Sequence, residues 1–329
     1  MPEVVGPEIF STHPLHPEVT RALAAIGPYR VASAPSQEAI LAESRGAAVI
    51  VVRAPIPVGV VVREKGLRAL IRHGAGLDMI PIEAATEAGV LVANVPGANA
   101  VTVAEHVVWS AMALLRRYPE VDRDLRQSGW AAGRAHSDMG RELSGRVLGV
   151  LGMGNVGTEL ARIARLGFGM RVVAHTRRAD AVPDGVEAVG FERLMAGAEV
   201  LALCCPLTAE TRGIVDAAAI GRMRPGAILV NVARGPVVVE AALIDALRDG
   251  RLGGAAIDVF DTQPLPEGHA FFGLPNVILT PHMAGITEES MLRMGRGVVA
   301  ETRRVAEGGL PERLVNPEAV PLYRARFGR

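Results

Sequence analysis

A glycine-rich segment in the middle of the chain has the residue types and the spacing that bind a dinucleotide. The pattern Gly-x-Gly-x-x-Gly is formed by Gly152, Met153, Gly154, Asn155, Val156 and Gly157. It follows an apolar stretch at residues 146–151 and opens a stretch with helical spacing, so a strand, a loop and a helix are expected in succession. The glycines allow a tight turn, close approach of a pyrophosphate and close packing of helix on strand. The phosphates would lie at the N-terminus of the helix, where unpaired N–H groups favour negative charge.

The residues after the next expected strand bear on which dinucleotide is bound. A carboxylate about twenty residues past the glycines normally holds the adenosine ribose diol. Here the strand expected at residues 170–175 is followed by Thr176, Arg177 and Arg178, with no acid. Guanidinium groups are charge-assisted, bidentate donors for a 2′-phosphate. We therefore expect NADP(H) to be favoured over NAD(H); the alternative is a solvated arginine pair on an exposed turn.

The elements that must position these residues alternate between strand and helix along the chain. Before the glycine loop, the patterns predict strands at 47–52, 69–72 and 90–93, and helices at 17–26, 37–43, 82–88 and 101–118. Residues 119–139 are expected to form a loop with a short helical piece. From the glycine loop onward, the patterns predict helices at 155–166, at 239–249 and after Thr287, and strands at 146–151, 170–175, 199–203, 226–231, 254–258 and 276–279. This alternation predicts parallel sheets covered by helices on both faces.

Several further segments place polar residues at the ends of apolar strands. They are Arg72-His-Gly74-Ala75-Gly76, Cys204-Cys-Pro206, Asn231-Val232-Ala233-Arg234, Asp258-Val-Phe and Thr280-Pro-His282. In order and spacing, over nearly the whole chain, they resemble the D-isomer-specific 2-hydroxyacid dehydrogenases. Glyoxylate and hydroxypyruvate reductases are the most similar members, since they too often carry Ser/Thr-Arg after the second strand. The resemblance implies reduction of a small 2-oxo acid to the D-2-hydroxy acid with NAD(P)H.

The resemblance assigns roles to individual residues. Arg234 would hold the substrate carboxylate and polarise the 2-oxo group, and His282 would protonate the carbonyl oxygen. Asp258 would contact the nicotinamide carboxamide. Further cofactor contacts are expected from Cys205, Pro206, Val232 and Ala233. From the other domain, the substrate carboxylate would be held by Arg53 and by backbone N–H groups of Gly74, Ala75 and Gly76.

One position departs from the family pattern. The family's catalytic glutamate, which pairs with the histidine, stands just before a proline, and this chain has Gln263 before Pro264. A glutamine can accept a hydrogen bond from the imidazole and orient it, but it cannot stabilise the imidazolium by charge. Asp261, two residues earlier, is an alternative partner for His282. Two other functions also stay open: a dehydrogenase for a more anionic acid such as phosphoglycerate or sulfolactate, and a nucleotide-sensing, corepressor-like scaffold with little turnover.

The resemblance also implies an architecture of two α/β domains. Residues 1–100 and 286–329 would form a flavodoxin-like substrate domain, and residues 101–285 would form a Rossmann domain inserted into it. Cofactor and substrate would occupy the cleft between the domains. The long helix at 101–118 would serve a homodimer interface, to which Trp109 and Trp130 contribute.

The composition bears on the number of domains, on possible nucleic-acid or membrane partners and on the cellular compartment. The 329 residues suffice for two domains, and 49% hydrophobic with 21% charged residues is typical of globular proteins. Lys+Arg and Asp+Glu each total 35, so no global field favours nucleic acid or an anionic membrane. No apolar run is long enough for a transmembrane helix, and the N-terminus lacks a signal-peptide pattern. The only cysteines, Cys204 and Cys205, are adjacent, which favours a cytoplasmic setting. No metal site is expected.

Overall fold

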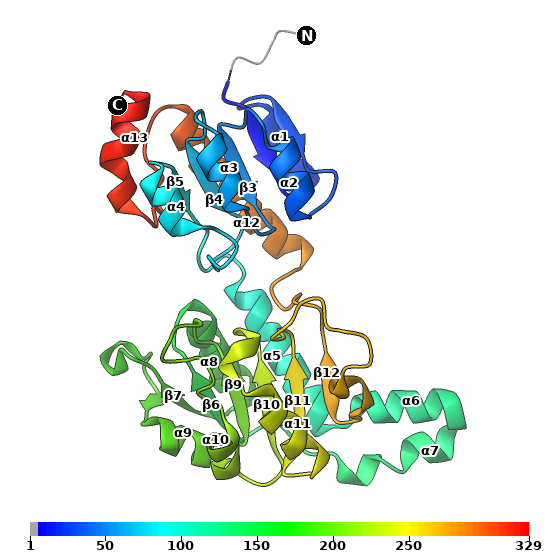
Figure 1. The fold of residues 1–329 in the computed structure, drawn as a ribbon. Coiled ribbons are helices and arrows are strands. Elements are labelled where there is room, and N and C mark those ends of the chain that lie inside the picture. The colour runs from blue at the N-terminus through cyan, green and yellow to red at the C-terminus, as the bar shows by residue number, and fades with distance from the viewer. Residues whose placement is uncertain (1–5, 329) are drawn as a thin grey trace. The chain divides into compact units, whose positions relative to one another are not determined.

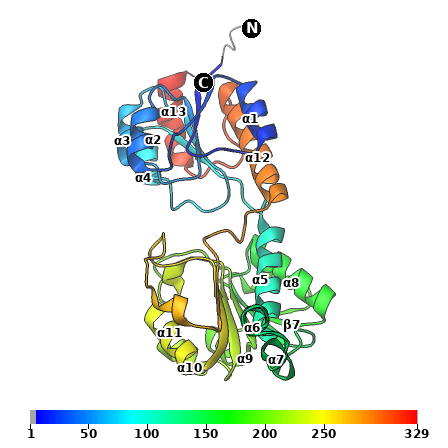
Figure 2. The same cartoon turned by 90° about the vertical axis from the view of Figure 1, so that its right-hand side faces the viewer.

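The structure, a computed structural model, describes residues 6–328 and consists of two compact units. Unit 1 contains the residues up to Asn99 and those from Ile286 onward, and unit 2 contains residues 100–285. Each has its own parallel sheet with helices on both faces, as Figures 1 and 2 show. The predicted α/β fold class is therefore confirmed.

Unit 1 is built on a five-stranded parallel sheet. Its strands are β1 (Ile9–Ser11), β2 (Tyr29–Val31), β3 (Val49–Val52), β4 (Ala69–Arg72) and β5 (Leu91–Ala93). They lie in the order β2-β1-β3-β4-β5, which is the flavodoxin-like order. Successive side chains of β3 alternate between the faces: Ile50 packs in one core, and Val49 and Val51 pack in the other.

Three helices cover each face of this sheet (Figure 2). One face carries α2 (Gln37–Glu43), α3 (Val58–Arg63) and α4 (Ile82–Glu87). The other carries α1 (Pro17–Ala24), α12 (Glu288–Ala306) and α13 (Val320–Phe327). The last long helix begins after Thr287, as predicted, because Thr287 and Ser290 form a reciprocal capping box at its N-terminus.

Unit 2 is built on a seven-stranded parallel sheet. Its strands are β6 (Val147–Leu151), β7 (Arg171–His175), β8 (Val186–Ala188), β9 (Val200–Leu203), β10 (Ala227–Asn231), β11 (Leu252–Ile257) and β12 (Val277–Leu279). Their order, β12-β11-β10-β9-β6-β7-β8, is that of a Rossmann fold with a seventh strand added at one edge. Since the order reverses at β6 and β9, a ligand site is expected at the carboxyl ends of these two strands.

Two helices pack on one face of this sheet and three on the other (Figure 2). The first pair is α5 (Ala100–Leu115) and α8 (Asn155–Phe168). The second group is α9 (Phe191–Gly197), α10 (Ala217–Arg222) and α11 (Glu240–Arg248). In β6, Leu148 and Val150 face α5 and α8, whereas Val147 and Leu151 belong to the opposite core.

The expected strands and helices are confirmed with boundaries shifted by a few residues, but the prediction for residues 119–139 was wrong. The helix starting near residue 100 ends at Leu115, and Arg117 takes a left-handed conformation, with φ of 54°. Two helices follow, α6 (Tyr118–Ser128) and α7 (Trp130–Arg134). Most residues of α6 are charged or polar and α7 has only five residues, so neither shows the broad apolar stripe from which a helix is predicted. The short β1, β2 and β8 were also missed.

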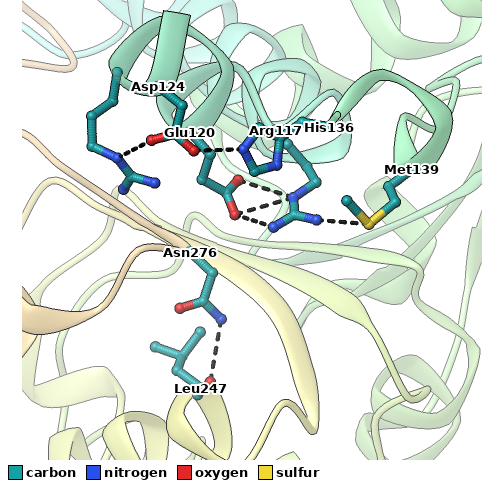
Figure 3. A network of polar contacts seen from close by, with 8 residues as sticks. Arg117, Glu120, Asp124, His136, Met139, Leu247 and Asn276 are labelled. Atoms are coloured by element: carbon teal, nitrogen blue, oxygen red, sulfur yellow. Dashed lines mark hydrogen bonds and ion pairs between the residues drawn. The ribbon is translucent and has the colours of Figure 1, made fainter. Parts of the chain in front are cut away.

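Polar contacts hold α6, α7 and the turn after them together (Figure 3). The Nε of Arg117 donates to both carboxylate oxygens of Glu120, at 3.1 and 3.2 Å. On the next turn of α6, Asp124 lies 2.7 Å from Nε2 of His136. Nearby, the side-chain amide of Asn276 donates to the carbonyl oxygen of Leu247 in the last turn of α11. In the described part of the chain, no helix is both long enough and apolar enough to span a membrane.

Candidate functional site

The three glycines of the fingerprint meet different surroundings in unit 2. Gly152 has a φ of 99°. A Cβ on Gly152 would lie 2.6 Å from the Cα of Cys205, which is the second residue after β9. A Cβ on Gly157 would overlap the carbonyl oxygen of Gly152. A Cβ on Gly154 would meet no atom within 4 Å. Two glycines are therefore required by the protein's own packing, whereas Gly154 leaves an open space above the loop.

The loop at Gly154 leaves the N-terminus of α8 open. Gly154 is the N-cap residue of α8. Because glycine has no side chain, the first N–H groups of that helix have no side-chain cap. A helix of 14 residues directs the positive end of its dipole to this point. Met153 lies buried beneath the loop, and Asn155 and Val156 form the first helical turn. The loop thus offers unpaired donors and room for an anion.

The two cysteines lie beside this loop and are not nucleophiles. Cys205 is buried, and Cys204 is only partly exposed. Burial raises the pKa of the Cys205 thiol to about 11 and that of Cys204 to about 12. Both thiols therefore remain protonated near neutral pH, which does not suit a nucleophile. Pro206 continues the segment on the exposed side.

The residues expected to select the cofactor follow β7. Thr176 is half-buried, and the side chains of Arg177 and Arg178 are exposed. Neither guanidinium forms a hydrogen bond or salt bridge with the residues that the structure describes. The pKa of Glu210, on the loop after β9, is lowered mainly by a hydrogen bond from the Thr208 hydroxyl and slightly by the charge of Arg177. Both arginines are therefore available to an anionic ligand.

Arg234 stands three residues past the end of β10, on a tightly held turn. Asn231, buried at the strand end, accepts from the N–H of Ala233 and donates to the carbonyl of Arg234, both at 3.1 Å. A Cβ on Gly235 would overlap the carbonyl group of Phe260. The Arg234 turn thus packs, backbone against backbone, on the segment that follows β11. Val232 lies half-exposed and Ala233 buried within the turn.

His282 and Gln263 are brought together at the carboxyl ends of β11 and β12. Nδ1 of His282 lies 3.1 Å from Oε1 of Gln263, and Nε2 of Gln263 donates to the carbonyl of Phe260 at 3.4 Å. Because that second bond uses the NH₂ group, the amide oxygen faces the imidazole and accepts from Nδ1–H. Nε2 of His282 is then the ring nitrogen that can exchange a proton with a substrate.

Asp258 shapes the turn that carries His282. Its carboxylate accepts from the Thr280 hydroxyl at 2.7 Å and from the N–H groups of Met283 and Ala284 at 2.8 and 3.0 Å. Its backbone carbonyl accepts from the N–H of His282, whose φ is 55°. A non-glycine residue in the left-handed region needs such support. The expected nicotinamide-contacting residue is therefore also the anchor of the histidine.

Asp261, the alternative partner of His282, has other neighbours. Its pKa is raised by partial burial and by the nearby carboxylate of Glu240, and Arg212 opposes this effect. The structure places Gln263, and not Asp261, at the imidazole. A neutral amide therefore stands at the imidazole, where the resemblance leads us to expect a carboxylate.

The residues expected to hold the substrate carboxylate in unit 1 also follow strand ends. The N–H of Arg53, after β3, donates to the Thr12 hydroxyl, after β1, at 2.8 Å. The order of the strands in unit 1 reverses at β1 and β3, so Arg53 lies where such sheets bind ligands. Burial lowers the pKa of its guanidinium. After β4, Gly74 has a φ of 133° and opens the loop that contains Ala75 and Gly76.

His73 lies behind that loop as a buried, uncharged residue. It is 3% exposed, and its Nε2 has no hydrogen-bond partner among the described residues. Burial, together with the charges of Arg53 and Arg72, lowers its pKa to about 4. His73 is therefore a structural residue and not an acid–base group. Sequence reasoning missed two positioning residues, Asn231 and Thr280; their only signal was that they stand at strand ends within the quoted segments.

Comparison with known proteins identifies the family. A family model described as the NAD binding domain of the D-isomer specific 2-hydroxyacid dehydrogenases matches residues 108–284. The glyoxylate reductase of Korarchaeum cryptofilum is 37% identical over 265 residues, which cover 79% of this chain and 80% of that protein. An NADPH-dependent glyoxylate/hydroxypyruvate reductase from Sinorhizobium meliloti, solved with NADP and malonate, has a TM-score of 0.82 at 28% identity, with 95% of this chain and 97% of that chain covered.

Longer proteins match as well. The D-3-phosphoglycerate dehydrogenase of Methanocaldococcus jannaschii is 35% identical over 320 residues, which cover 95% of this chain. The chain spans 60% of the length of that relative and 53% of the corresponding protein of Archaeoglobus fulgidus. By its colinear strand-end segments, its fold and these relatives, the chain belongs to the family of D-isomer specific 2-hydroxyacid dehydrogenases.

Proposed function

We propose that this chain is an NAD(P)-dependent oxidoreductase that reduces a small 2-oxo acid, of the glyoxylate or hydroxypyruvate type, to the D-2-hydroxy acid. The observation that carries the proposal is the arrangement of Arg234, His282 and Gln263 within unit 2. The three residues follow β10, β12 and β11, which are neighbours in one parallel sheet. An arginine and an oriented imidazole at the ends of strands in one sheet are suited to bind a carboxylate and to protonate a carbonyl oxygen.

The cofactor would be held by residues of the same sheet. The pyrophosphate would lie over Gly154 at the N-terminus of α8, and Thr176, Arg177 and Arg178 would surround the adenosine ribose. Cys205, Pro206, Val232, Ala233 and Asp258 would line the remainder of the site. When bound, the nicotinamide supplies the hydride for reduction or accepts it for oxidation. The exposed, unpaired Arg177 and Arg178 support NADP(H) as the favoured form.

The protein's own groups would perform the acid–base chemistry. Arg234 would bind the substrate carboxylate and draw electron density from the 2-oxo group, with Arg53, Gly74, Ala75 and Gly76 as further carboxylate contacts. In the direction of reduction, the proton on Nε2 of His282 would pass to the substrate oxygen; in oxidation it would return. Gln263 would keep Nδ1 protonated and the ring oriented throughout.

The substrate class is tested by a screen that follows absorbance at 340 nm. Glyoxylate, hydroxypyruvate, pyruvate and phosphohydroxypyruvate are each offered with NADPH and with NADH. We expect the highest kcat/KM with an uncharged or hydroxymethyl side chain and NADPH. Preference for phosphohydroxypyruvate would instead support the alternative of a more anionic substrate. The similarity to proteins named D-3-phosphoglycerate dehydrogenase is the observation that favours this alternative. Cofactor binding without turnover of any acid would support the scaffold.

We further propose that the protein is a cytoplasmic homodimer in which α5, α6 and α7 contribute to the interface. Large apolar side chains are exposed on these helices, notably Trp130 at 77%, Trp109 at 55% and Tyr118 at 51%. Such a concentration is unusual for a free surface. Light scattering after size-exclusion chromatography measures the mass: we expect a dimer, and we expect Trp130→Ser to shift it toward monomer.

A further inference from the structure

We propose that Arg72 is a positioning residue that keeps the loop at residues 73–76 in the form that binds the substrate carboxylate. The inference rests on the proposed function, which supplies that carboxylate. Arg72 is the last residue of β4, and its side chain is half-buried. Its Nε donates to the carbonyl oxygen of Gly76, and its Nη1 donates to those of Val52 and His73, each at 2.9 Å. One guanidinium therefore bonds both ends of the loop to the end of β3.

All four carbonyl oxygens of loop 73–76 accept hydrogen bonds from the protein. The first and the last are bonded by Arg72. The second accepts from the backbone N–H of Val95 at 2.9 Å, and the third from the side-chain amide of Asn94 at 2.9 Å. Carbonyl oxygens repel a carboxylate, so engaging every one of them with a donor on the protein removes the repulsion from the loop.

The backbone donors of the same loop are left for a ligand. The N–H groups of Ala75, which is exposed, and of Gly76, which is half-buried, donate to no acceptor among the described residues, so both can bind a ligand. Gly74, with its φ of 133°, makes the turn that exposes these two consecutive N–H groups. Successive N–H groups in such a turn form an anion-binding concavity. The loop is thus a carboxylate cradle whose shape is fixed from behind by Arg72.

An arginine is needed because several carbonyl oxygens must be bonded at fixed angles from one side chain. The guanidinium presents donors in a rigid planar fork, whereas a lysine ammonium is a compact group on a flexible stem. Arg72→Lys would keep the positive charge but lose the fork, so loop 73–76 would no longer be held in one conformation. Arg72→Lys therefore distinguishes the effect of the guanidinium geometry on the loop from the effect of the positive charge.

The test compares Arg72→Lys with Arg326→Lys in the full-length protein. Arg326, on α13, also donates to backbone carbonyls of unit 1, those of Lys65 at 2.5 Å and of Ala88 among them, but none of these carbonyls belongs to loop 73–76. We expect Arg72→Lys to raise KM for the 2-oxo acid at least tenfold, with kcat changed less than threefold and the Kd of NADPH unchanged. Arg326→Lys should leave KM unchanged at a similar loss of thermal stability.

A second variant covers the case in which Arg72→Lys does not fold. Asn94 is half-exposed, and Asn94→Ala removes one donor from the back of the loop, so we expect KM to rise severalfold without loss of kcat. The role of Arg72 would be overturned, while the proposed function stands, if KM is unchanged in each variant that folds. An equal change of KM in the Arg326→Lys control would overturn it as well. Absence of turnover and of 2-oxo acid binding in the unmodified protein would overturn both.

Discussion

His282 and Gln263 are linked by a hydrogen bond of 3.1 Å between the imidazole Nδ1 and the amide Oε1. The amide orients the ring as a carboxylate would, but it brings no negative charge to the imidazolium. The resemblance places the family's glutamate at the position of Gln263, so we expect the pH dependence of the proposed reaction to differ from that of glutamate-bearing relatives.

Gln263→Glu should move the pH profile for reduction upward. A carboxylate at hydrogen-bond distance favours the charged imidazolium and raises its pKa, commonly by about one unit or more. Reduction needs His282 protonated, so the limb on which kcat/KM for reduction is lost should shift to higher pH. Asp261→Asn is the matched control, since the charges near Asp261 are those of Glu240 and Arg212. A larger shift with the control than with Gln263→Glu would show that the histidine depends on Asp261.

Replacing Arg177 and Arg178 together by alanine should remove most of the preference for NADPH. Each charge-assisted contact to the 2′-phosphate is worth about 1.5–3 kcal/mol, so the ratio of the NADPH and NADH dissociation constants should change at least tenfold. Fluorescence titration of both reduced cofactors measures this ratio. Equal affinity for the two cofactors in the unmodified protein would contradict the expected selectivity.

Arg234→Ala should impair both substrate binding and the chemical step. The guanidinium is proposed to hold the carboxylate and to stabilise developing charge on the carbonyl oxygen, so KM should rise and kcat should fall. The loss in kcat/KM should be about a hundredfold or more, with the Kd of NADPH unchanged. Steady-state kinetics give both parameters; an effect on KM alone would restrict Arg234 to binding.

Gly154→Ala should weaken cofactor binding without destabilising the protein. The new Cβ meets no protein atom within 4 Å and therefore occupies the space assigned to the pyrophosphate. Gly167→Ala is the control, because Gly167 is exposed in the last turn of the same helix and also has no atom within 4 Å of its Cβ position. NADPH affinity should fall tenfold or more only in the first variant. Loss of thermal stability in that variant alone would show that the space is needed by the protein itself.

His73 should make the folded state sensitive to acid. Its pKa of about 4 in the folded protein lies below the ordinary value of 6.5, so between these pH values only the unfolded chain binds the proton. The free energy of unfolding is therefore unaffected by the protonation of His73 above pH 6.5, and it falls by about 3 kcal/mol as the pH is lowered from 6.5 to 4. Urea unfolding at several pH values should show a shallower decline for His73→Asn. An identical decline in both proteins would mean that His73 does not set it.

The sequence allowed prediction of those features that repeat periodically or stand at strand ends. The glycine loop and the strands from β3 to β12 other than β8 follow from such patterns, whereas a polar partner for His282 was expected only from the resemblance to the family. Strand β1 has only three residues, and α6 has too few apolar residues to show an extended apolar stripe, so neither was predicted. The choice between Gln263 and Asp261 also required coordinates, because the segment after β11 is irregular and the aim of a side chain there does not follow from spacing.

Analysis of the product of hydroxypyruvate reduction tests the central proposal most directly. The full-length protein is incubated with NADPH and hydroxypyruvate, oxidation is followed at 340 nm, and the configuration of the product is determined by chiral chromatography. We predict stoichiometric oxidation of NADPH and formation of the D-isomer only, with loss of turnover in His282→Ala. Formation of the L-isomer, or no turnover of hydroxypyruvate or glyoxylate by protein that binds NADPH, would contradict the proposed function.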